Sequence, residues 1–156
     1  MVRVLFVCTG NTCRSPMAEA MLRGRVRAGG FDDKVSVLSA GLAAAGEFPP
    51  SPHAVAAMDR RGFDMSDHRS RQLLPELVKA ADIILTMTAA HKRAIAAAAP
   101  EAAGKVHTLA GYAGEEGDVA DPFGGSGELY EACAAEMERL IEKIWQKIAQ
   151  LAGKSD

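Results

Sequence analysis

Residues 4–16, with the sequence VLFVCTGNTCRSP, contain the pattern that limits the possible folds of this chain most strongly. The apolar residues 4–7 are typical of a buried strand, whereas Ser15 and Pro16 are typical of a helix N-cap and a first helical residue. We therefore expect a tight turn at residues 9–13, the anion loop, between strand and helix. Such a turn aims backbone N–H groups at one point before the positive end of the helix dipole, so the pattern predicts anion binding.

Two side chains at the ends of this loop have reactive or anion-binding groups. Cys8 lies where the strand ends, and the positive field there favours its thiolate form. Arg14 follows six positions later and can grip an anion with a two-pronged guanidinium. A cysteine in a strand is otherwise a small buried hydrophobe, and a nucleotide-binding loop would require Gly-Lys-Ser/Thr, which this loop lacks. The combination predicts nucleophilic attack on phosphorus.

Size and charge exclude several classes of function. A chain of 156 residues predicts a single domain, residues 1–156. Its net charge of −2 provides no field for nucleic acid or a membrane surface, and Arg23, Arg25 and Arg27 are typical of a solvated helix face. No stretch has the apolar length of a membrane span or the pattern of a cleavable leader. We expect a cytoplasmic protein that binds neither nucleic acid nor membrane.

Cysteines and histidines add two expectations. The three cysteines, Cys8, Cys13 and Cys133, are an odd set, which argues against a disulfide framework and fits a reducing compartment. The four histidines, at positions 53, 68, 91 and 107, show no metal-ligand spacing with one another or with cysteine. The sequence therefore predicts no metal site.

Apolar patterning predicts alternating strands and helices. Strands are expected at residues 1–7, 34–40, 83–87 and 106–109, and helices at 16–28, 52–61, 75–80, 89–99 and 128–151. Such alternation favours an α/β fold with a four-stranded parallel sheet, in which ligands bind beyond the carboxyl ends of the strands. Ser39, Ala40 and Gly41 are expected at the same sheet edge as the anion loop. Cys133 lies on the apolar stripe of the last helix, where we expect core packing.

Asp121 is the best candidate for the proton donor that such an attack requires. It precedes Pro122, which restricts its backbone, and the glycines that follow Phe123 let the loop approach a ligand. The alternative is a solvated turn aspartate, because Asp-Pro is common in turns and acidic residues are frequent in this segment.

Three motifs together resemble the low-molecular-weight protein tyrosine phosphatase family. They are VCTGNTCRSP at residues 7–16, SAG at 39–41 and DPFGG at 121–125, and their order and spacing match over essentially the whole chain. The resemblance implies a four-stranded parallel sheet with helices on both faces and a phosphate-binding loop after the first strand. It also implies hydrolysis of phosphorylated protein side chains, with no cofactor.

The resemblance implies a role for each matching residue. Cys8 would become phosphocysteine, Arg14 would bind phosphate oxygens, and Asp121 would act first as acid and then as base. Ser15 would stabilise the thiolate, with helix capping as a compatible role. Asn11, Ser39 and His68 would support the loop, although an exposed His68 without a catalytic role is the alternative. The implied phosphate-binding residues are Thr9, Gly10, Asn11, Thr12, Cys13 and Arg14.

Thr12 and Phe123 would form the wall beside the leaving group. Members that act on phosphotyrosine commonly carry a branched apolar residue at the position of Thr12, and many have tyrosines after the proline of the acid motif. A hydroxyl at position 12 suits a planar guanidinium, so the chain is similar to the bacterial protein-arginine phosphatase branch. We favour phosphoarginine, with phosphotyrosine as the alternative if Thr12 merely fills space.

Two further functions agree less well with the sequence. Arsenate reductases of this fold relay a disulfide through additional cysteines, but this chain has none between Cys13 and Cys133. A phosphoprotein-binding module would need neither Cys8 nor Asp121. A separate hypothesis is a reversible Cys8–Cys13 disulfide that protects the nucleophile, whereas the alternative is that Cys13 is a buried thiol. The sequence leaves oligomeric state open.

Overall fold

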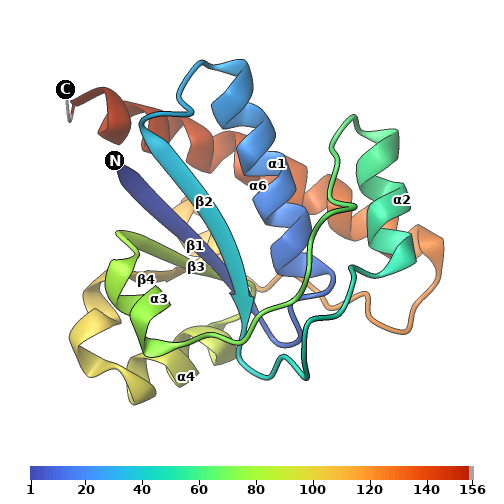
Figure 1. Ribbon diagram of the computed structural model, residues 1–156, viewed down its shortest axis with the longest axis horizontal. Helices are drawn as coiled ribbons and strands as arrows, with labels where there is room; N and C mark the ends of the chain where they lie inside the picture. Colours follow the sequence, from blue (N-terminus) through green and yellow to red (C-terminus); the bar gives the residue numbers. More distant parts are fainter. Residues whose placement is uncertain (155–156) are drawn as a thin grey trace.

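The structure is a computed structural model that describes residues 1–154, and its centre is a four-stranded parallel sheet covered by helices on both faces (Figure 1). The strands are β1 (Val2–Cys8), β2 (Val35–Gly41), β3 (Ile83–Thr86) and β4 (Val106–Thr108), in the order β2-β1-β3-β4. The helices are α1 (Arg14–Ala28), α2 (Pro52–Arg60), α3 (Pro75–Ala80), α4 (Ala89–Ala98), η1 (Pro100–Lys105), α5 (Leu109–Tyr112) and α6 (Gly127–Lys154). The expected fold class is confirmed.

Strand β1 is apolar throughout its second half because both of its faces are covered. Val4 and Phe6 pack into the larger core cluster, which also includes side chains of α1 and α6. Leu5 and Val7 pack into the second cluster, on the side of α3, α4 and η1. A parallel strand buried on two faces shows a continuous apolar run instead of an alternating one.

Helix α6 runs along the α1 side of the sheet (Figure 1). Its apolar stripe is fully buried at Met137, Ile144 and Ile148. Cys133 is only 7 % exposed and belongs to the same core cluster, so the expectation of core packing is confirmed.

The register of the sheet places Cys8 and the SAG segment at the same edge. Cys8 at the end of β1 pairs with Gly41 at the end of β2, so the SAG segment lies at the same edge as the anion loop, as expected. A Cβ atom on Gly41 would come within 2.6 Å of the Thr9 carbonyl oxygen. Only glycine allows the backbone of the anion loop to pass this close to β2.

Several element boundaries differ from expectation. Helix α1 begins at Arg14 with Cys13 as its N-cap, so Ser15 is not the cap. Strands β1 and β2 each lie one residue further along the chain than predicted. Leu109 begins the short helix α5 instead of ending a strand, and Pro100 opens η1, where no helix was expected. Local turns formed by three to six residues are the elements that periodicity detects least well.

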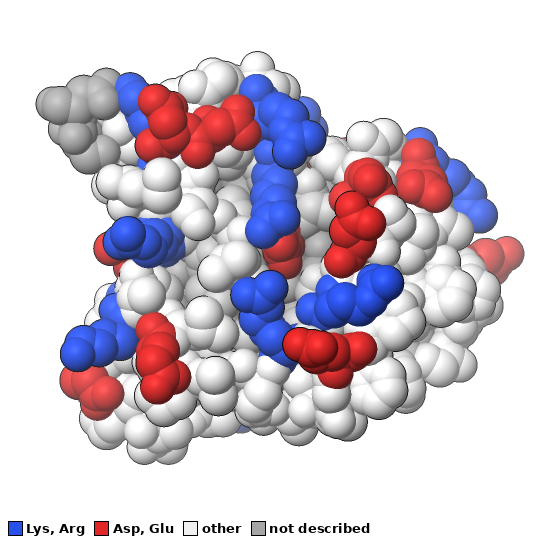
Figure 2. All heavy atoms as spheres, viewed as in Figure 1, with Lys and Arg blue, Asp and Glu red and all other residues white. Residues whose placement is uncertain are grey.

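The charged surface carries both signs in close mixture. In Figure 2 basic and acidic side chains are interspersed over the visible face. Arg23 pairs with Glu19 and Arg25 pairs with Glu142, each at 2.8 Å. No helix within residues 1–154 is long and apolar enough to cross a membrane.

Candidate active site

Surrounding segments hold the anion loop through hydrogen bonds to its carbonyl groups. The N–H groups of Leu42, Ala43, Ser51 and Met17 and the Nε2 atom of His68 bond to these carbonyls at 2.8–3.0 Å. In a trans peptide the N–H group points away from the carbonyl, so outward-facing carbonyls turn the loop's N–H groups inward. The loop is thus shaped as a cradle for an anion. The accepting carbonyls are those of Cys8, directly before the loop, and of Thr9, Asn11, Thr12 and Cys13 within it. The Cys13 carbonyl accepts the Met17 N–H in the first turn of α1.

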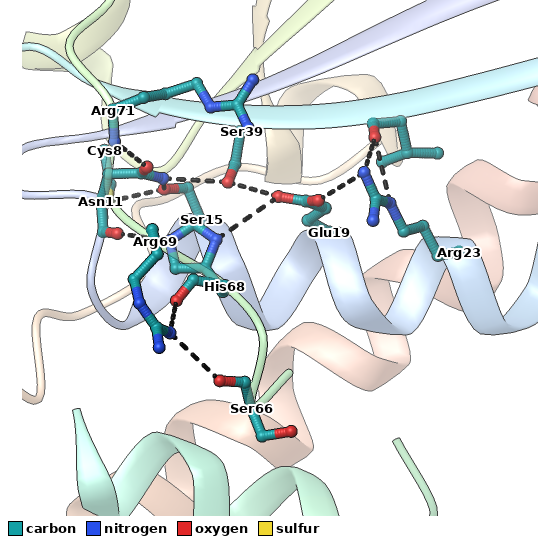
Figure 3. A network of polar contacts seen from close by, with 11 residues as sticks. Cys8, Asn11, Ser15, Glu19, Arg23, Ser39, Ser66, His68, Arg69 and Arg71 are labelled. Carbon is teal, nitrogen blue, oxygen red and sulfur yellow. Dashed lines mark hydrogen bonds and ion pairs between the residues drawn. The ribbon is translucent and has the colours of Figure 1, made fainter. Parts of the chain in front are cut away.

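Asn11 is the centre of a polar network beneath this cradle (Figure 3). Its backbone has a φ of 59°, a left-handed conformation that asparagine tolerates better than most residues. Its Nδ2 atom donates to the hydroxyls of Ser15 and Ser39, and its Oδ1 atom accepts from the Arg71 N–H, each at 2.9 Å. The side chain is fully buried, so the network fixes the loop's sharpest turn.

Ser15 lies directly against Cys8. Its hydroxyl oxygen is 2.9 Å from the Cys8 sulfur, and both side chains are buried. The hydroxyl therefore faces the thiol, not the orphan N–H groups of α1. This explains why a serine at the second helical position carries no capping bond.

Glu19 extends the network along α1, as Figure 3 shows. The Ser39 hydroxyl donates to the Glu19 carboxylate at 2.5 Å. His68, only 10 % exposed, donates from Nε2 to the Asn11 carbonyl at 2.8 Å and places Nδ1 3.9 Å from Glu19. Burial lowers the pKa of His68, although Asn11 and Glu19 act in the opposite direction. Sequence reasoning missed Glu19, which lies one helical turn beyond Ser15.

Arg14 crosses from α1 toward the segment before α6. It is 4 % exposed, its Nη1 atom donates to the Val119 carbonyl at 3.0 Å, and its Nη2 atom lies 3.4 Å from Asp121 Oδ2. Its Nε atom is buried and has no hydrogen-bond partner within the part of the chain described. A buried cationic N–H without a partner is costly, and a bound anion would satisfy it.

Asp121 lies on a more open segment, beside Arg14 and Cys13. Its side chain is half exposed, and its Oδ1 atom accepts the Phe123 N–H at 3.0 Å. The Phe123 side chain is 75 % exposed. The nearby Asp118 instead accepts the N–H of Ala89 at 2.9 Å, at the start of α4. Of these two acids, Asp121 is the one that forms an ion pair with Arg14.

Cys13 and Thr12 complete the loop. Cys13 is buried with its sulfur 4.0 Å from Asp121 Oδ1, and burial, together with Cys8, raises the pKa of its thiol to about 11. The Thr12 side chain is partly buried, and the Thr12 carbonyl is held by the Ser51 N–H at 2.9 Å. Within residues 1–154 no group of three or more His, Cys, Asp and Glu side chains could hold a metal ion.

His91 contacts the anion loop, which the sequence did not predict. It lies on the third residue of α4, is 8 % exposed, and places Nε2 2.9 Å from the Thr9 hydroxyl. The only sequence signal was a lone histidine in an alanine-rich helix. Such a residue has no spacing that points to a site eighty-two positions away.

Comparison with known proteins connects this geometry to a family. Residues 3–154 match the family described as low molecular weight phosphotyrosine protein phosphatase. The chain is 44% identical over 147 residues to a protein-arginine-phosphatase of Geobacillus stearothermophilus, covering 94% of this chain and 95% of the relative. It is 40% identical over 148 residues to a probable low molecular weight protein-tyrosine-phosphatase, EpsP, of Ralstonia solanacearum, covering 95% and 97%.

A solved structure gives the same result. The chain superposes with a TM-score of 0.90 on a mutant of the YwlE arginine phosphatase that carries a phosphorylated active-site serine. The two sequences are 40% identical, and the match covers 95% of this chain and 96% of that one. The chain therefore belongs to the low molecular weight phosphotyrosine protein phosphatase family and is a protein phosphatase, an enzyme of the hydrolase class.

Proposed function

We propose that this phosphatase removes phosphate from phosphoarginine side chains of proteins, through a phosphocysteine on Cys8. The observation that supports the mechanism is the position of Asp121 beside the anion loop. Its carboxylate lies 3.4 Å from the Arg14 guanidinium and 4.0 Å from the Cys13 sulfur, and the Arg14 Nε atom is unpaired within the described residues. Thr12 and the similarity to protein-arginine-phosphatases support the choice of substrate.

In the first half-reaction the Cys8 thiolate attacks phosphorus as the bond to the leaving nitrogen breaks. The loop N–H groups and Arg14 bind the phosphoryl oxygens, whose charge is spread in the transition state. Asp121 donates a proton to the departing guanidinium nitrogen, so that arginine leaves without excess negative charge. The products are free arginine side chain and phosphocysteine.

In the second half-reaction water attacks the phosphocysteine. Asp121, now ionised, takes a proton from that water, the sulfur–phosphorus bond breaks, and Cys8 leaves as thiolate. The Ser15 hydroxyl, 2.9 Å from the sulfur, donates to this thiolate in each half-reaction. Inorganic phosphate is released and the enzyme returns to its starting protonation state.

The supporting residues act by keeping the cradle rigid. Asn11 joins Ser15 to Ser39, and His68 fixes the Asn11 carbonyl. A cradle formed before the substrate arrives does not have to be organised during the reaction. We infer that Asn11, Ser39 and His68 contribute to the rate through the position of the loop N–H groups.

Thr12 and Phe123 are the proposed substrate wall. Phe123 is largely exposed and can cover the flat guanidinium from one side. Thr12 presents a hydroxyl that can hydrogen-bond a guanidinium N–H, a partner that an isoleucine would lack. Phosphotyrosine remains the second candidate, because EpsP is named a tyrosine phosphatase.

The test is kcat/KM on matched peptides that carry phosphoarginine or phosphotyrosine, for the wild type, Thr12→Ile and Thr12→Val. We expect the wild type to prefer phosphoarginine. Both variants should lose about tenfold on that peptide, the usual effect of one lost hydrogen bond to a charged group, and should gain on phosphotyrosine. A wild type that prefers phosphotyrosine and is indifferent to Thr12→Ile would contradict the substrate assignment and leave the mechanism standing.

Cys13 extends the proposal to redox protection in a reducing cytoplasm. Peroxide would convert the Cys8 thiolate to sulfenic acid, and the Cys13 thiol would then displace water and form a disulfide. Mass spectrometry after mild peroxide should show a Cys8–Cys13 bridge that dithiothreitol reverses, and Cys13→Ser should instead overoxidise at Cys8. Equal overoxidation of wild type and Cys13→Ser would contradict this role.

A further inference from the structure

The contact between His91 and Thr9 has no part in the mechanism above. Thr9 directly follows Cys8 in the anion loop and its side chain is exposed, whereas the His91 side chain on α4 is buried. The His91 N–H bonds to the Thr88 hydroxyl, which caps α4, so the histidine has a fixed place. The ring therefore offers the anion loop a hydrogen-bond partner from a separate element.

The second ring nitrogen determines the direction of this bond. His91 Nδ1 is buried and has no hydrogen-bond partner within the described chain. A neutral imidazole carries one proton, and buried N–H groups without an acceptor are rare. The proton therefore belongs on Nε2, which donates to the Thr9 oxygen.

The charge state of the ring agrees with this arrangement. Burial is the main cause that lowers the pKa of His91, and Arg14 on α1 acts in the same direction. Asp118 and Asp121, in the segment before α6, act in the opposite direction. In the neutral ring Nδ1 carries no proton, so its burial without a hydrogen-bond partner costs little free energy.

We propose that the Thr9 hydroxyl is a substrate ligand that donates its hydrogen to a phosphoryl oxygen, and that His91 is the positioning residue that directs it. Because Thr9 accepts from His91, its own hydrogen is not used in that bond and can turn to the pocket. This inference rests on the proposed function, since it adds a donor to the phosphate cradle of that reaction. The donor acts on the phosphoryl group and is indifferent to whether arginine or tyrosine leaves.

The kinetic test is a double-mutant cycle. Thr9→Val removes the hydroxyl and keeps the side-chain shape, and it should lower kcat/KM about tenfold, the usual effect of a bond to a charged group. Thr9→Ser retains the hydroxyl and should stay within about twofold of the wild type. His91→Leu should lose about fivefold, and His91→Gln, whose amide N–H can reach the same oxygen, should recover most of that loss.

Non-additivity separates positioning from mere packing. If His91 acts through Thr9, then Thr9→Val combined with His91→Leu should lose about tenfold, not the fiftyfold that independent effects would give. The fold-losses should be equal on phosphoarginine and phosphotyrosine peptides. The affinity for inorganic phosphate should fall by a similar factor in Thr9→Val, which tests the contact without any turnover.

Two results would overturn the proposal. One is an unchanged phosphate affinity and kcat/KM in Thr9→Val, and the other is a proton on Nδ1 of His91 in the ¹⁵N spectrum of the ring, assigned with His91→Gln. Failure of the proposed function would look different. The wild type would then prefer the phosphotyrosine peptide or hydrolyse neither peptide, while the phosphate affinities and the ring spectrum would still report on Thr9 and His91.

Discussion

The two loops that meet at the pocket are constructed differently. The anion loop, residues 9–13, lies on a network of buried side chains, and its carbonyls are tied to surrounding elements. The acid loop, residues 113–126, carries a half-exposed Asp121 and a largely exposed Phe123. It also contains three glycines at positive φ, Gly114, Gly117 and Gly124.

The difference matches what each loop has to do. A cradle for phosphate stabilises the transition state best when its donors are fixed before the reaction. In the proposed mechanism Asp121 serves a leaving group in one step and water in the next, so some freedom of its loop is useful. The two loops are still connected by Arg14, which directly follows the anion loop and donates a hydrogen bond to the Val119 carbonyl of the acid loop.

The largest expected effect comes from removing the acid. Asp121→Asn should lower kcat by roughly 10²- to 10⁴-fold, because a positioned proton donor typically contributes that much. Asparagine can keep the bond to the Phe123 N–H, so the loop itself should persist. The measurement is steady-state turnover of a phosphoarginine peptide, with folding checked by circular dichroism.

Asp118→Asn is the matched control. It changes a carboxylate three positions away, and the amide oxygen can still accept the Ala89 N–H. We expect a loss of threefold or less, an estimate that rests on the absence of any proton-transfer role for this side chain. Equal losses at the two positions would mean that the wrong acid has been assigned.

The rigid loop is tested at Asn11. Asn11→Gly accepts the φ of 59° and loses the side-chain bonds, so the free energy of unfolding should fall by about 2 kcal/mol. Asn11→Ala loses the same bonds and adds left-handed strain of about 1 kcal/mol more. Chemical denaturation measures both, and activity should fall in both.

Gly124→Ala provides the contrast from the acid loop. A Cβ atom there meets no atom within 4 Å, so only the strain at a φ of +76° remains, about 1 kcal/mol. If this substitution destabilises the protein as much as Asn11→Ala does, the two loops are not constructed as differently as their contacts indicate.

The smallest effect is a pH dependence of stability. Burial is the main cause that lowers the pKa of both His68 and His91, which contact the anion loop at Asn11 and Thr9. As the pH falls through 6.5 the unfolded chain binds these protons first, so stability should decrease between about pH 7 and pH 5. His91→Gln should flatten that slope in urea denaturation, and a slope that it leaves unchanged would contradict the assignment.

Most of the architecture could be predicted from local pattern. The run at residues 4–7 and the apolar stripe of α6 are long enough for their periodicity to identify a central strand and a packed helix. Leu109 was misassigned because a four-residue helix has too few turns to show a period. Ser15 was misassigned as a cap because its hydroxyl is engaged by Cys8 and Asn11, contacts that no local preference encodes.

The same limit applies to the site. Cys8, Arg14 and Asp121 were predicted because they lie in short motifs, and the structure places the Arg14 guanidinium 3.4 Å from the Asp121 carboxylate. Glu19 and His91 were not found, because neither lies in a recognisable motif and their hydrogen-bond partners, Ser39 and Thr9, are distant from them in sequence. Their partners are fixed by tertiary packing, which single-sequence reasoning does not resolve.

The anchoring of Thr12 has a consequence for how such an enzyme diversifies. Its carbonyl is held by the Ser51 N–H, so the main chain at this position is fixed independently of the side chain. In the proposed function Thr12 lines the substrate, so a substitution there would change which substrate fits while the main chain of the anion loop keeps its place. After gene duplication, one codon change at this position would then redirect a copy toward another phosphorylated residue.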